Sequence, residues 1–363
     1  MATLELTKPD ISTPPATSTQ RVLLIADDLT GACDAAAAFF PGRSVRVWLG
    51  PAPDGDNRDS VQAFNTDSRG LRPEDAAIAV AECALNSSHD ALLFKKLDSA
   101  GRGPIAAELL AAQHALNTAI ALFAPSFPAH GRIVRDGVLH IHQTSGGHTQ
   151  LPLLSLFEPE HHPSIAVVDS PVDLVAAVAS GKRIAICNAE TQEELEAFAR
   201  TATALPGRVL YAGSSGLARA LAAVHYTAET QSQQQPPVAP GTLFIIGTPH
   251  PVTQLQLLRL ETERPDADLL LIHSEEEDAE VVRTRFAQAE PQSLVLSGGD
   301  TALRVLRALG ARSISLRGEI LPGIPWGIID GGLAHQRTVV TKSGGFGSSN
   351  TLSRILTTLS GQA

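Results

Sequence analysis

The chain has 363 residues, of which 43% are hydrophobic and 18% are charged, and its net charge at pH 7 is -10. At about 100–200 residues per domain, this length predicts two domains that can each bury a core. The acidic balance argues against nucleic acid as a partner, because phosphate backbones are bound by clustered Lys and Arg. No apolar run approaches the ~18 residues of a membrane-spanning helix, and the three cysteines match no zinc or disulfide spacing.

Residues 1–20 are rich in Thr, Ser and Pro and lack the apolar core of a signal peptide. They predict a disordered tail, and the protein is expected in the cytoplasm without a membrane partner. Beyond the tail, short β-branched segments alternate with Ala- and Leu-rich ones. Strands are predicted over 21–28, 61–67, 91–98, 119–124, 165–169, 183–188 and 209–212, and helices over 29–40, 72–87 and 103–117. Asp136-Gly137 predicts a hairpin between 132–134 and 138–141.

The Gln- and Pro-rich segment 228–240 predicts a linker. After it the alternation resumes, with strands predicted over 242–247, 269–273, 293–297, 314–316 and 338–342, and helices over 252–263, 276–289 and 301–309. Alternation at this spacing is typical of parallel sheets covered by helices on both faces. We therefore predict an α/β protein with two doubly wound, mostly parallel-sheet domains, 21–227 and 241–363. In such sheets ligands bind at the carboxyl ends of the strands, so the active site is expected in the cleft between the domains.

Asp27 and Asp28 end the first predicted strand and open a helix. Helix capping by Asp28 or Thr30 would account for one such residue. Two adjacent carboxylates repel each other, which favours a chemical role such as general base or metal ligand. The sequence does not divide these roles between the two.

Cations gather at the ends of the next strands. Arg69 follows the second strand, and Lys95, Lys96, Asp98 and Arg102 surround the end of the third, before a helix N-terminus that favours anions. These residues predict a pocket for a hydroxylated carboxylate, although a solvated charged loop would look similar. Lys95 and Lys96 are strand neighbours, so only one of them can face a pocket.

Two glycine-rich loops follow strands of the second predicted domain, Ser297-Gly298-Gly299-Asp300-Thr301 and 341–347. Glycines allow a backbone to approach phosphates, and a hydroxyl or a helix N-terminus can donate to phosphate oxygens. Neither loop matches the P-loop or the dinucleotide-binding pattern. A third candidate is the segment from Gly247 to Pro251, where His250 could contact a nucleotide or simply start a helix. His140 and His142 alternate on a strand, but no third ligand completes a zinc set.

As a set, these motifs resemble the four-carbon acid sugar kinase family. The resemblance rests on 27–32, 95–99 with Arg102-Gly103, 127–132, 212–218, 247–251, 297–302 and 342–347, in the same order along nearly the whole chain. It implies transfer of the γ-phosphate of ATP to the terminal hydroxyl of a tetronate such as threonate, erythronate or an oxo-tetronate, a role in carbohydrate metabolism. The amino-terminal domain would bind the sugar acid and the carboxy-terminal domain the ATP. The nucleotide site would then be formed by Thr248, His250, Ser297, Gly298, Gly299, Asp300, Thr301, Lys342, Ser343, Gly344, Gly345, Phe346 and Gly347.

The chain departs from the family pattern on the acceptor side. It has Ala100-Gly101-Arg102-Gly103-Pro104 where the family usually has Thr-Leu-Arg-Gly-Asn, and it is shorter between residues 132 and 165. These differences leave the acceptor's identity open, including another small hydroxy acid.

The mechanism implied is one of positioning and charge neutralisation. Arg69 and Arg102 would hold the carboxylate or the transferring phosphoryl group, and Asp27 or Asp28 would accept the hydroxyl proton. Mg²⁺ would bridge the ATP phosphates, helped by Asp300 or the other Asp, and domain closure would exclude water. The rival functions are a non-catalytic sensor of sugar acid and nucleotide, and a nicotinamide dehydrogenase, whose fingerprint is missing. The sequence is compatible with a homo-oligomer but does not specify one.

Overall fold

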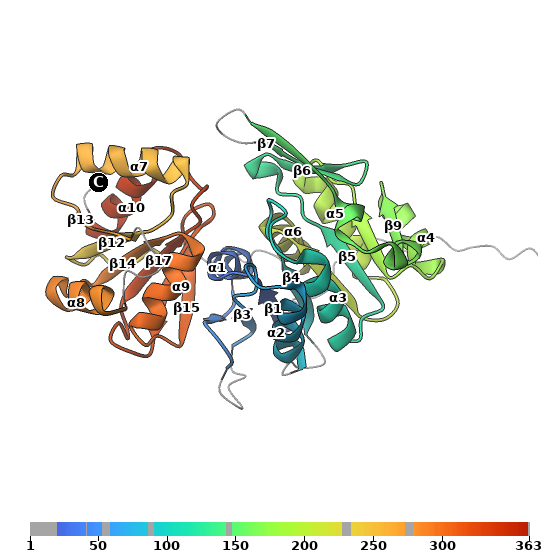
Figure 1. The fold of residues 1–363 in the computed structure, drawn as a ribbon, viewed down its shortest axis with the longest axis horizontal. Coiled ribbons are helices and arrows are strands. Elements are labelled where there is room, and N and C mark those ends of the chain that lie inside the picture. Colours follow the sequence, from blue (N-terminus) through green and yellow to red (C-terminus); the bar gives the residue numbers. More distant parts are fainter. Residues whose placement is uncertain are drawn as a thin grey trace, which may run out of the picture.

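The computed structural model describes residues 20–40, 42–52, 59–85, 91–142, 147–226, 234–272 and 279–361. Almost all of the predicted tail, and the first part of the predicted linker, lie outside the described residues. The predicted α/β class is confirmed: a large, mostly parallel sheet is flanked by helices on both faces (Figure 1). Among the described residues, no helix is both long and apolar enough to cross a membrane.

The strands of the large sheet, in chain order, are β1 (Val22–Ala26), β2 (Val45–Trp48), β3 (Val61–Asn65), β4 (Leu92–Lys96), β5 (Ile120–Ala124), β9 (Ile165–Val168), β10 (Ile184–Cys187), β11 (Val209–Gly213), β12 (Thr242–Ile246), β13 (Asp268–Leu271), β14 (Ser293–Ser297), β15 (Ser313–Leu321), β16 (Ile324–Asp330) and β17 (Thr338–Lys342). The helices are α1 (Leu29–Ala37), α2 (Pro73–Leu85), α3 (Ile105–Ala115), α4 (Pro171–Ala179), α5 (Gln192–Ala202), α6 (Ser215–His225), α7 (Pro251–Glu263), α8 (Ala279–Ala289), α9 (Gly299–Ala308) and α10 (Thr351–Ser360). The predicted hairpin is part of a separate antiparallel sheet of β6 (Arg132–Arg135), β7 (Val138–His142) and β8 (His148–Pro152).

The strands of the two halves form one continuous sheet. Its order is β13-β12-β14-β17-β16-β15-β2-β3-β1-β4-β11-β5-β10-β9. The junction is the antiparallel pairing of β15 with β2, in which Val47 lies opposite Ile314. The sequence patterns predict neither β2 nor β16, and they predict two separate sheets. In the structure, β2 of the N-terminal half pairs with β15 of the C-terminal half, so the two halves share one sheet. Neither β2 nor β16 is followed by a helix, so neither belongs to a strand–helix repeat.

Three apolar clusters cover the faces of this sheet. The first lies on one face and runs across the junction, joining α1, α4, α5 and α6 to α8 and α9. On the other face, α2 and α3 pack over the N-terminal strands, and α7 and α10 pack over the C-terminal strands. The shared first cluster means that the two halves are held together by core packing as well as by the β2–β15 hydrogen bonds.

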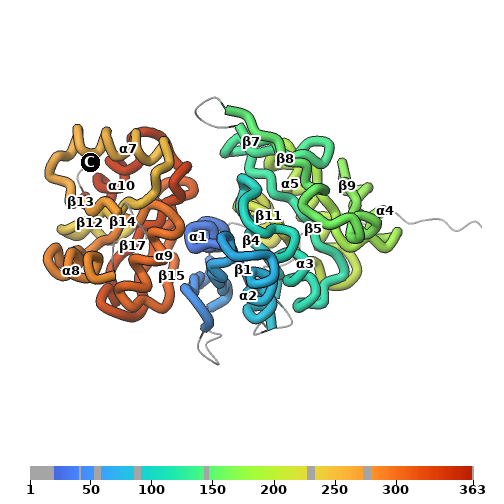
Figure 2. The backbone as a smooth tube through the Cα atoms, viewed as in Figure 1, coloured from blue at the N-terminus to red at the C-terminus, as the bar shows by residue number. Residues whose placement is uncertain are grey.

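Helix α1 lies at the junction of the two halves (Figure 2). Its sequence, LTGACDAAA, has small side chains over most of its length, and all nine residues are buried. Small residues allow neighbouring elements to approach closely, and α1 contacts α6 on one side and α9, β15, β16 and β17 on the other. The carboxyl end of β1 is therefore placed directly against the C-terminal half.

Candidate active site

The adjacent carboxylates after β1 have different partners. Asp28 is the N-cap of α1: its backbone is extended (φ −144°, ψ 159°), and its Oδ1 accepts a hydrogen bond from Gly31 N at 2.9 Å. Its Oδ2 accepts another from Thr30 Oγ1 at 2.7 Å. Asp27 accepts from Arg69 through Oδ2, while its Oδ1 is buried with no hydrogen-bond partner. Helix capping thus accounts for Asp28 but not for Asp27.

The turn after β3 brings Arg69 onto both carboxylates. The backbone N–H groups of Ser68 and Arg69 both donate to Asp27 O, at 3.1 and 3.3 Å. The guanidinium donates from Nε to Asp27 Oδ2 at 2.6 Å and from Nη2 to Asp28 Oδ1 at 2.7 Å. Asp98 Oδ1 lies 3.6 Å from Nη2. Such a planar cation offsets the repulsion between neighbouring carboxylates. Arg69 is therefore already paired with the protein's own acidic groups.

The loop after β4 supplies a second pair. Arg102 donates from Nε and Nη2 to the two oxygens of Asp98, each at 2.8 Å. Asp98 also accepts from the backbone N–H groups of Ala100 and Arg102. Burial acts to raise the pKa of Asp98, but the bonds from Arg102 and the charges of Arg69 and Lys96 outweigh it and hold this pKa well below its usual range. The Arg102 side chain is 68% exposed, so this pair borders solvent.

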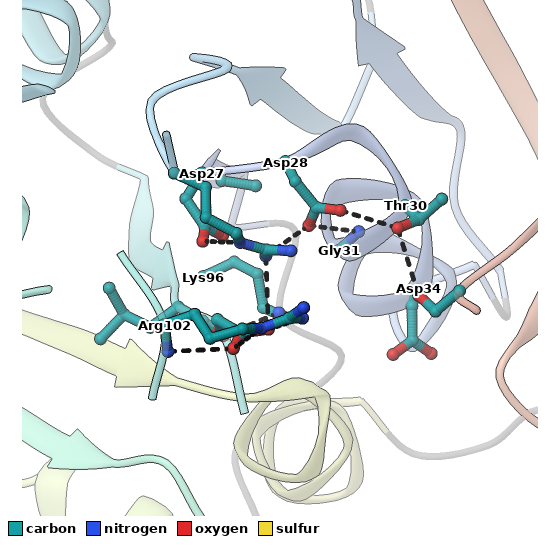
Figure 3. A network of polar contacts seen from close by, with 12 residues as sticks. Asp27, Asp28, Thr30, Gly31, Asp34, Lys96 and Arg102 are labelled. Carbon is teal, nitrogen blue, oxygen red and sulfur yellow. Dashed lines mark hydrogen bonds and ion pairs between the residues drawn. The ribbon is translucent and has the colours of Figure 1, made fainter. Parts of the chain in front are cut away.

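The neighbouring lysines of β4 have opposite environments, as expected for successive strand residues. Lys96 Nζ donates to Leu97 O at 2.8 Å, and its charge helps to lower the pKa of Asp28. Figure 3 shows its ammonium end on the same side as the paired carboxylates. Lys95 is fully buried, and its Nζ pairs with Glu108 Oε2 at 2.9 Å. The sequence predicts Lys95 at the substrate, whereas the structure pairs its ammonium with Glu108.

We call Asp27, Asp28, Arg69, Lys96, Asp98 and Arg102 the strand-end cluster. Within it the two adjacent carboxyl groups differ in proton affinity. Burial raises the pKa of Asp27, and the lowering by Arg69 only partly offsets this. Burial acts on Asp28 in the same way, but Arg69, Lys96 and the hydrogen bond from Thr30 outweigh it and lower its pKa. Neighbouring titratable groups with separated pKa values are typical of acid–base sites.

The first glycine loop, between β14 and α9, lies against this cluster. Gly298 has φ +107°, a conformation that favours glycine. Gly299 begins α9 so close to Asp28 that a Cβ at position 299 would collide with Asp28 Oδ2. Ser297 Oγ, at the end of β14, is buried with no hydrogen-bond partner. A free hydroxyl, an open backbone and a helix N-terminus therefore meet at one place.

The other predicted nucleotide residues near this loop have mixed environments. Asp300 is exposed in the first turn of α9. Thr301 is buried, and its side chain packs against Gly247, so it supports the loop from the protein interior. His250 is the N-cap of α7, where its Nδ1 accepts from Val252 N at 3.2 Å. Burial lowers the pKa of His250, and the charge of Lys342 adds to this.

The second glycine loop, after β17, is held from inside by Lys342. Its Nζ donates to Thr253 Oγ1 at 2.9 Å and to Ser343 O at 3.0 Å, with Gly344 O at 3.4 Å. Burial lowers the pKa of Lys342 to about 7. Ser343 Oγ donates to Thr30 Oγ1 at 3.1 Å, which links this loop to α1. Lys342 thus stabilises the loop backbone, because its ammonium donates to the loop's own carbonyl groups.

The loop continues into contacts with the N-terminal half. The Phe346 ring stacks on His130, with ring centroids 4.1 Å apart, and lies edge-on to Phe127 at 6.1 Å. Arg132 Cζ lies 5.9 Å from the Phe346 ring centroid. Gly347 follows with φ +86°. In the sequence, His130 and Arg132 stand out only as members of the motif 127–132. Both lie at the Phe346 ring, more than 200 residues away, and no local pattern reveals this contact.

The third predicted nucleotide segment joins these loops. A Cβ at Gly344 would lie 2.5 Å from Thr248 Oγ1, and one at Gly345 would lie 3.1 Å from His250 Nε2. The three segments predicted to bind nucleotide therefore converge at the carboxyl ends of β12, β14 and β17, which are neighbours in the sheet. Larger residues at these glycines would collide with Thr248 and His250.

ATP fits this arrangement. The loops offer backbone N–H groups, the unpaired Ser297 hydroxyl and the N-terminus of α9, which together suit phosphate oxygens. Mg²⁺ usually takes one or two protein carboxylates together with substrate phosphates and water. Asp28, beside Gly299, and the exposed Asp300 are oxygen donors of that kind. The described residues contain no group of three or more His, Cys, Asp or Glu that could hold a metal without the nucleotide.

Two family models match the chain, one in its N-terminal half and one in its C-terminal half. A family model described as a sugar-binding N-terminal domain matches residues 22–172 and 161–221. One described as a nucleotide-binding C-terminal domain matches residues 279–352. The strand-end cluster lies in the first match, and both glycine loops lie in the second.

Relatives with assigned activities match over almost their full length. The chain is 29% identical over 395 residues to a D-threonate kinase of Bordetella bronchiseptica, covering 91% of this chain and 95% of that one. It is 24% identical over 421 residues to a D-erythronate kinase of Heliobacterium modesticaldum, covering 91% and 94%. A crystal structure of a Haemophilus influenzae protein has the same fold, with a TM-score of 0.65 and 17% identity over 92% of this chain and 99% of that one. The chain belongs to the four-carbon acid sugar kinase family, in which a sugar-binding N-terminal domain is joined to a nucleotide-binding C-terminal domain.

Proposed function

We propose that this protein is an ATP-dependent kinase that transfers the γ-phosphate to the terminal hydroxyl of a four-carbon sugar acid of the threonate or erythronate type. The observation that carries the proposal is the direct contact between Asp28 of the strand-end cluster and Gly299 of the nucleotide loop. Phosphoryl transfer requires the acceptor hydroxyl and the γ-phosphate to meet within a few ångströms. A carboxylate pair in contact with a glycine-rich loop provides such a meeting point.

Asp27 is the proposed general base. Its Oδ1 has no partner, and its raised pKa gives it more proton affinity than its neighbour. As the acceptor oxygen attacks the γ-phosphorus, Asp27 takes the hydroxyl proton, the bond from that phosphorus to the bridging oxygen breaks, and ADP leaves. Asp28 remains an anion that caps α1 and holds Arg69 in place.

Arg102 and Lys96 are the proposed cations on the acceptor side. The exposed Arg102 guanidinium uses Nε and Nη2 on Asp98, and its Nη1 is the proposed donor to a substrate oxygen. Arg69 has a positioning role, because both carboxylates engage it. Mg²⁺, when bound with ATP, would neutralise charge on the phosphates next to Asp28 and Asp300.

The proposal is tested by incubating the purified protein with ATP, Mg²⁺ and each stereoisomer of the four-carbon acids, and by measuring ADP release. Substrate-dependent ADP release with one tetronate, and its loss in Asp27→Asn, would support the kinase. Five-carbon acids and the matched four-carbon polyols serve as comparisons for chain length and charge. Binding of acid and ATP without any ADP release would contradict the proposal and favour a sensor.

A further inference from the structure

Arg132 lies where the N-terminal half meets the second glycine loop. It is the first residue of β6 and follows Gly131, whose φ of +66° ends a short 3-10 turn. Its backbone is fixed by two bonds with Phe127: Phe127 N donates to Arg132 O at 2.7 Å, and Arg132 N donates to Phe127 O at 3.2 Å. The side chain reaches toward the Phe346 ring, 5.9 Å from its centroid. The two bonds with Phe127 fix the backbone from which the guanidinium extends.

The guanidinium of Arg132 is buried without hydrogen-bond partners on two of its nitrogens. Both Nε and Nη1 are inaccessible to solvent and donate to no group among the described residues. The arginines of the strand-end cluster differ from it in this respect, since Arg69 donates to two carboxylates and Arg102 to one. A guanidinium stays charged at any physiological pH and carries five N–H donors.

Unpaired donors of this kind are costly in a folded protein. Nearly all buried polar groups have a partner, and each exception needs an explanation, such as a catalytic role or an ion that completes the site. The electrostatic surroundings indicate which ligands could do so. Burial lowers the pKa of Arg132, and only the charges of Asp98 and Asp34 act in the opposite direction. Neither carboxylate is hydrogen-bonded to it: Asp98 accepts from Arg102, and Asp34 accepts from Ser215.

Arg132 lies between the acceptor side and the nucleotide side of the proposed active site. On the acceptor side it is close enough to Asp98 and Arg102 for their charges to affect it. On the nucleotide side, its charge together with that of Arg102 helps to lower the pKa of His250. An anion held here would contact Arg132 while lying between the strand-end cluster and the loop that carries Phe346.

We propose that the Arg132 guanidinium donates a hydrogen bond from Nε or Nη1, its two unpaired nitrogens, to an oxyanion of the bound reactants. This inference rests on the proposed kinase function and adds a residue for which sequence analysis had assigned no role. Two groups have the required chemistry: the carboxylate of the sugar acid and the phosphoryl group that moves between the reactants. A charged N–H donor suits either of them.

Steady-state kinetics of Arg132→Gln and Arg132→Lys test the proposal and distinguish the two sources. A charge-assisted contact of this kind corresponds to a loss of about tenfold or more. If the carboxylate is the ligand, KM for the acid rises by that factor, and the preference for the acid over its matched polyol shrinks. If the phosphoryl group is the ligand, kcat falls while both KM values stay near those of the wild type. Lysine keeps the charge but loses the planar guanidinium and its fixed N–H directions, so it should recover only part of either loss.

Arg135→Gln is the matched control. Arg135 lies on the same strand, but it is exposed and pairs with Glu190, so its replacement should leave kcat and KM unchanged. Melting temperatures of all three variants separate a binding defect from a folding defect. Wild-type kcat, KM and acid preference in both Arg132 variants would overturn the proposal.

A binding experiment keeps this inference distinct from the proposed reaction. If the wild-type protein phosphorylates no acid, the kinase proposal fails, but Arg132 can still be tested with inorganic phosphate as the probe. We expect phosphate to raise the melting temperature of the wild type and of Arg135→Gln, and to do so much less in Arg132→Gln. Equal phosphate-induced shifts in all three proteins would refute an oxyanion site at Arg132, whatever reaction the protein catalyses.

Discussion

The carboxylate of Asp28 lies against the backbone of Gly299, so that the end of β1 touches the start of α9. Asp28 caps one helix while Gly299 opens another, and the two helix N-termini therefore face the same small region. The hydrogen bond from Ser343 to Thr30 adds the second glycine loop to this contact. The region combines two sources of positive potential with one held carboxylate, as expected where a phosphate and a hydroxyl are brought together.

The close approach at Gly345 predicts how ATP binding responds to a single added methyl group. In Gly345→Ala, the new Cβ would lie 3.1 Å from His250 Nε2, so the imidazole or the loop must move. We expect ATP affinity to weaken by about tenfold, which corresponds to ~1.4 kcal/mol. Gly50→Ala is the control, because a Cβ there meets nothing within 4 Å. Nucleotide titration by calorimetry measures both, and equal affinities would show that this loop does not contact ATP.

The buried pair of Lys95 and Glu108 predicts a stability defect without a direct catalytic one. Glu108→Gln would leave the fully buried Lys95 ammonium without its counter-charge, which typically costs ~3–5 kcal/mol. Chemical unfolding of the variant should therefore show a lower free energy of unfolding, while KM for the acid at permissive temperature stays near wild type. Asp75→Asn, which breaks the exposed pair with Arg72, should change little. A large rise in KM for the acid in Glu108→Gln would instead indicate that Lys95 contacts the substrate.

The strand–helix alternation predicted the fold class because many of the buried strands are short apolar runs followed by a helix, as β1 is followed by α1 and β14 by α9. The predicted strand over 338–342 matches β17, and that over 293–297 matches β14. The continuity of the sheet could not be predicted in the same way. It depends on the pairing of β2 with β15, which are more than 260 residues apart, and edge pairing leaves little local signal.

The residues of the candidate site could be predicted where polar side chains come directly after a strand. Asp27, Asp28, Arg69, Asp98 and Arg102 come together because parallel strands β3, β1 and β4 are neighbours with a common direction. Their internal pairing was not predictable, since Arg69 could equally have faced a ligand. Lys95 shows the limit of the method: strand alternation says that one lysine points away, but only packing against Glu108 shows which one.

The stack of His130 on Phe346 predicts a pH dependence of stability. Burial lowers the pKa of His130 to about 4, and Arg132 and Arg219 add to the effect. The unfolded chain has an ordinary imidazole with a pKa of about 6.5. Between these values the unfolded state binds more protons, so stability falls as pH decreases from about 6.5 to 4. Melting temperatures measured across this range should fall less steeply in His130→Gln than in the wild type or in His114→Gln. Parallel curves for all three proteins would show that His130 is not buried neutral at this interface.

The different partners of Asp27 and Asp28 predict different defects in their asparagine variants. Asp27→Asn keeps the size of the side chain and an oxygen for Arg69, but it removes the proposed proton acceptor, so kcat should fall by about 10²–10⁴-fold with ATP affinity unchanged. Because burial raises the pKa of Asp27, wild-type kcat should also fall as pH decreases through that raised value. Asp28→Asn keeps a good N-cap but removes the charge that Arg69 and Lys96 face, so its melting temperature should fall more than that of Asp27→Asn. If Asp28 also holds Mg²⁺, excess metal should restore part of its rate. Wild-type turnover in Asp27→Asn would show that another group accepts the proton, and equal defects in both variants would show that the two carboxylates act as one unit.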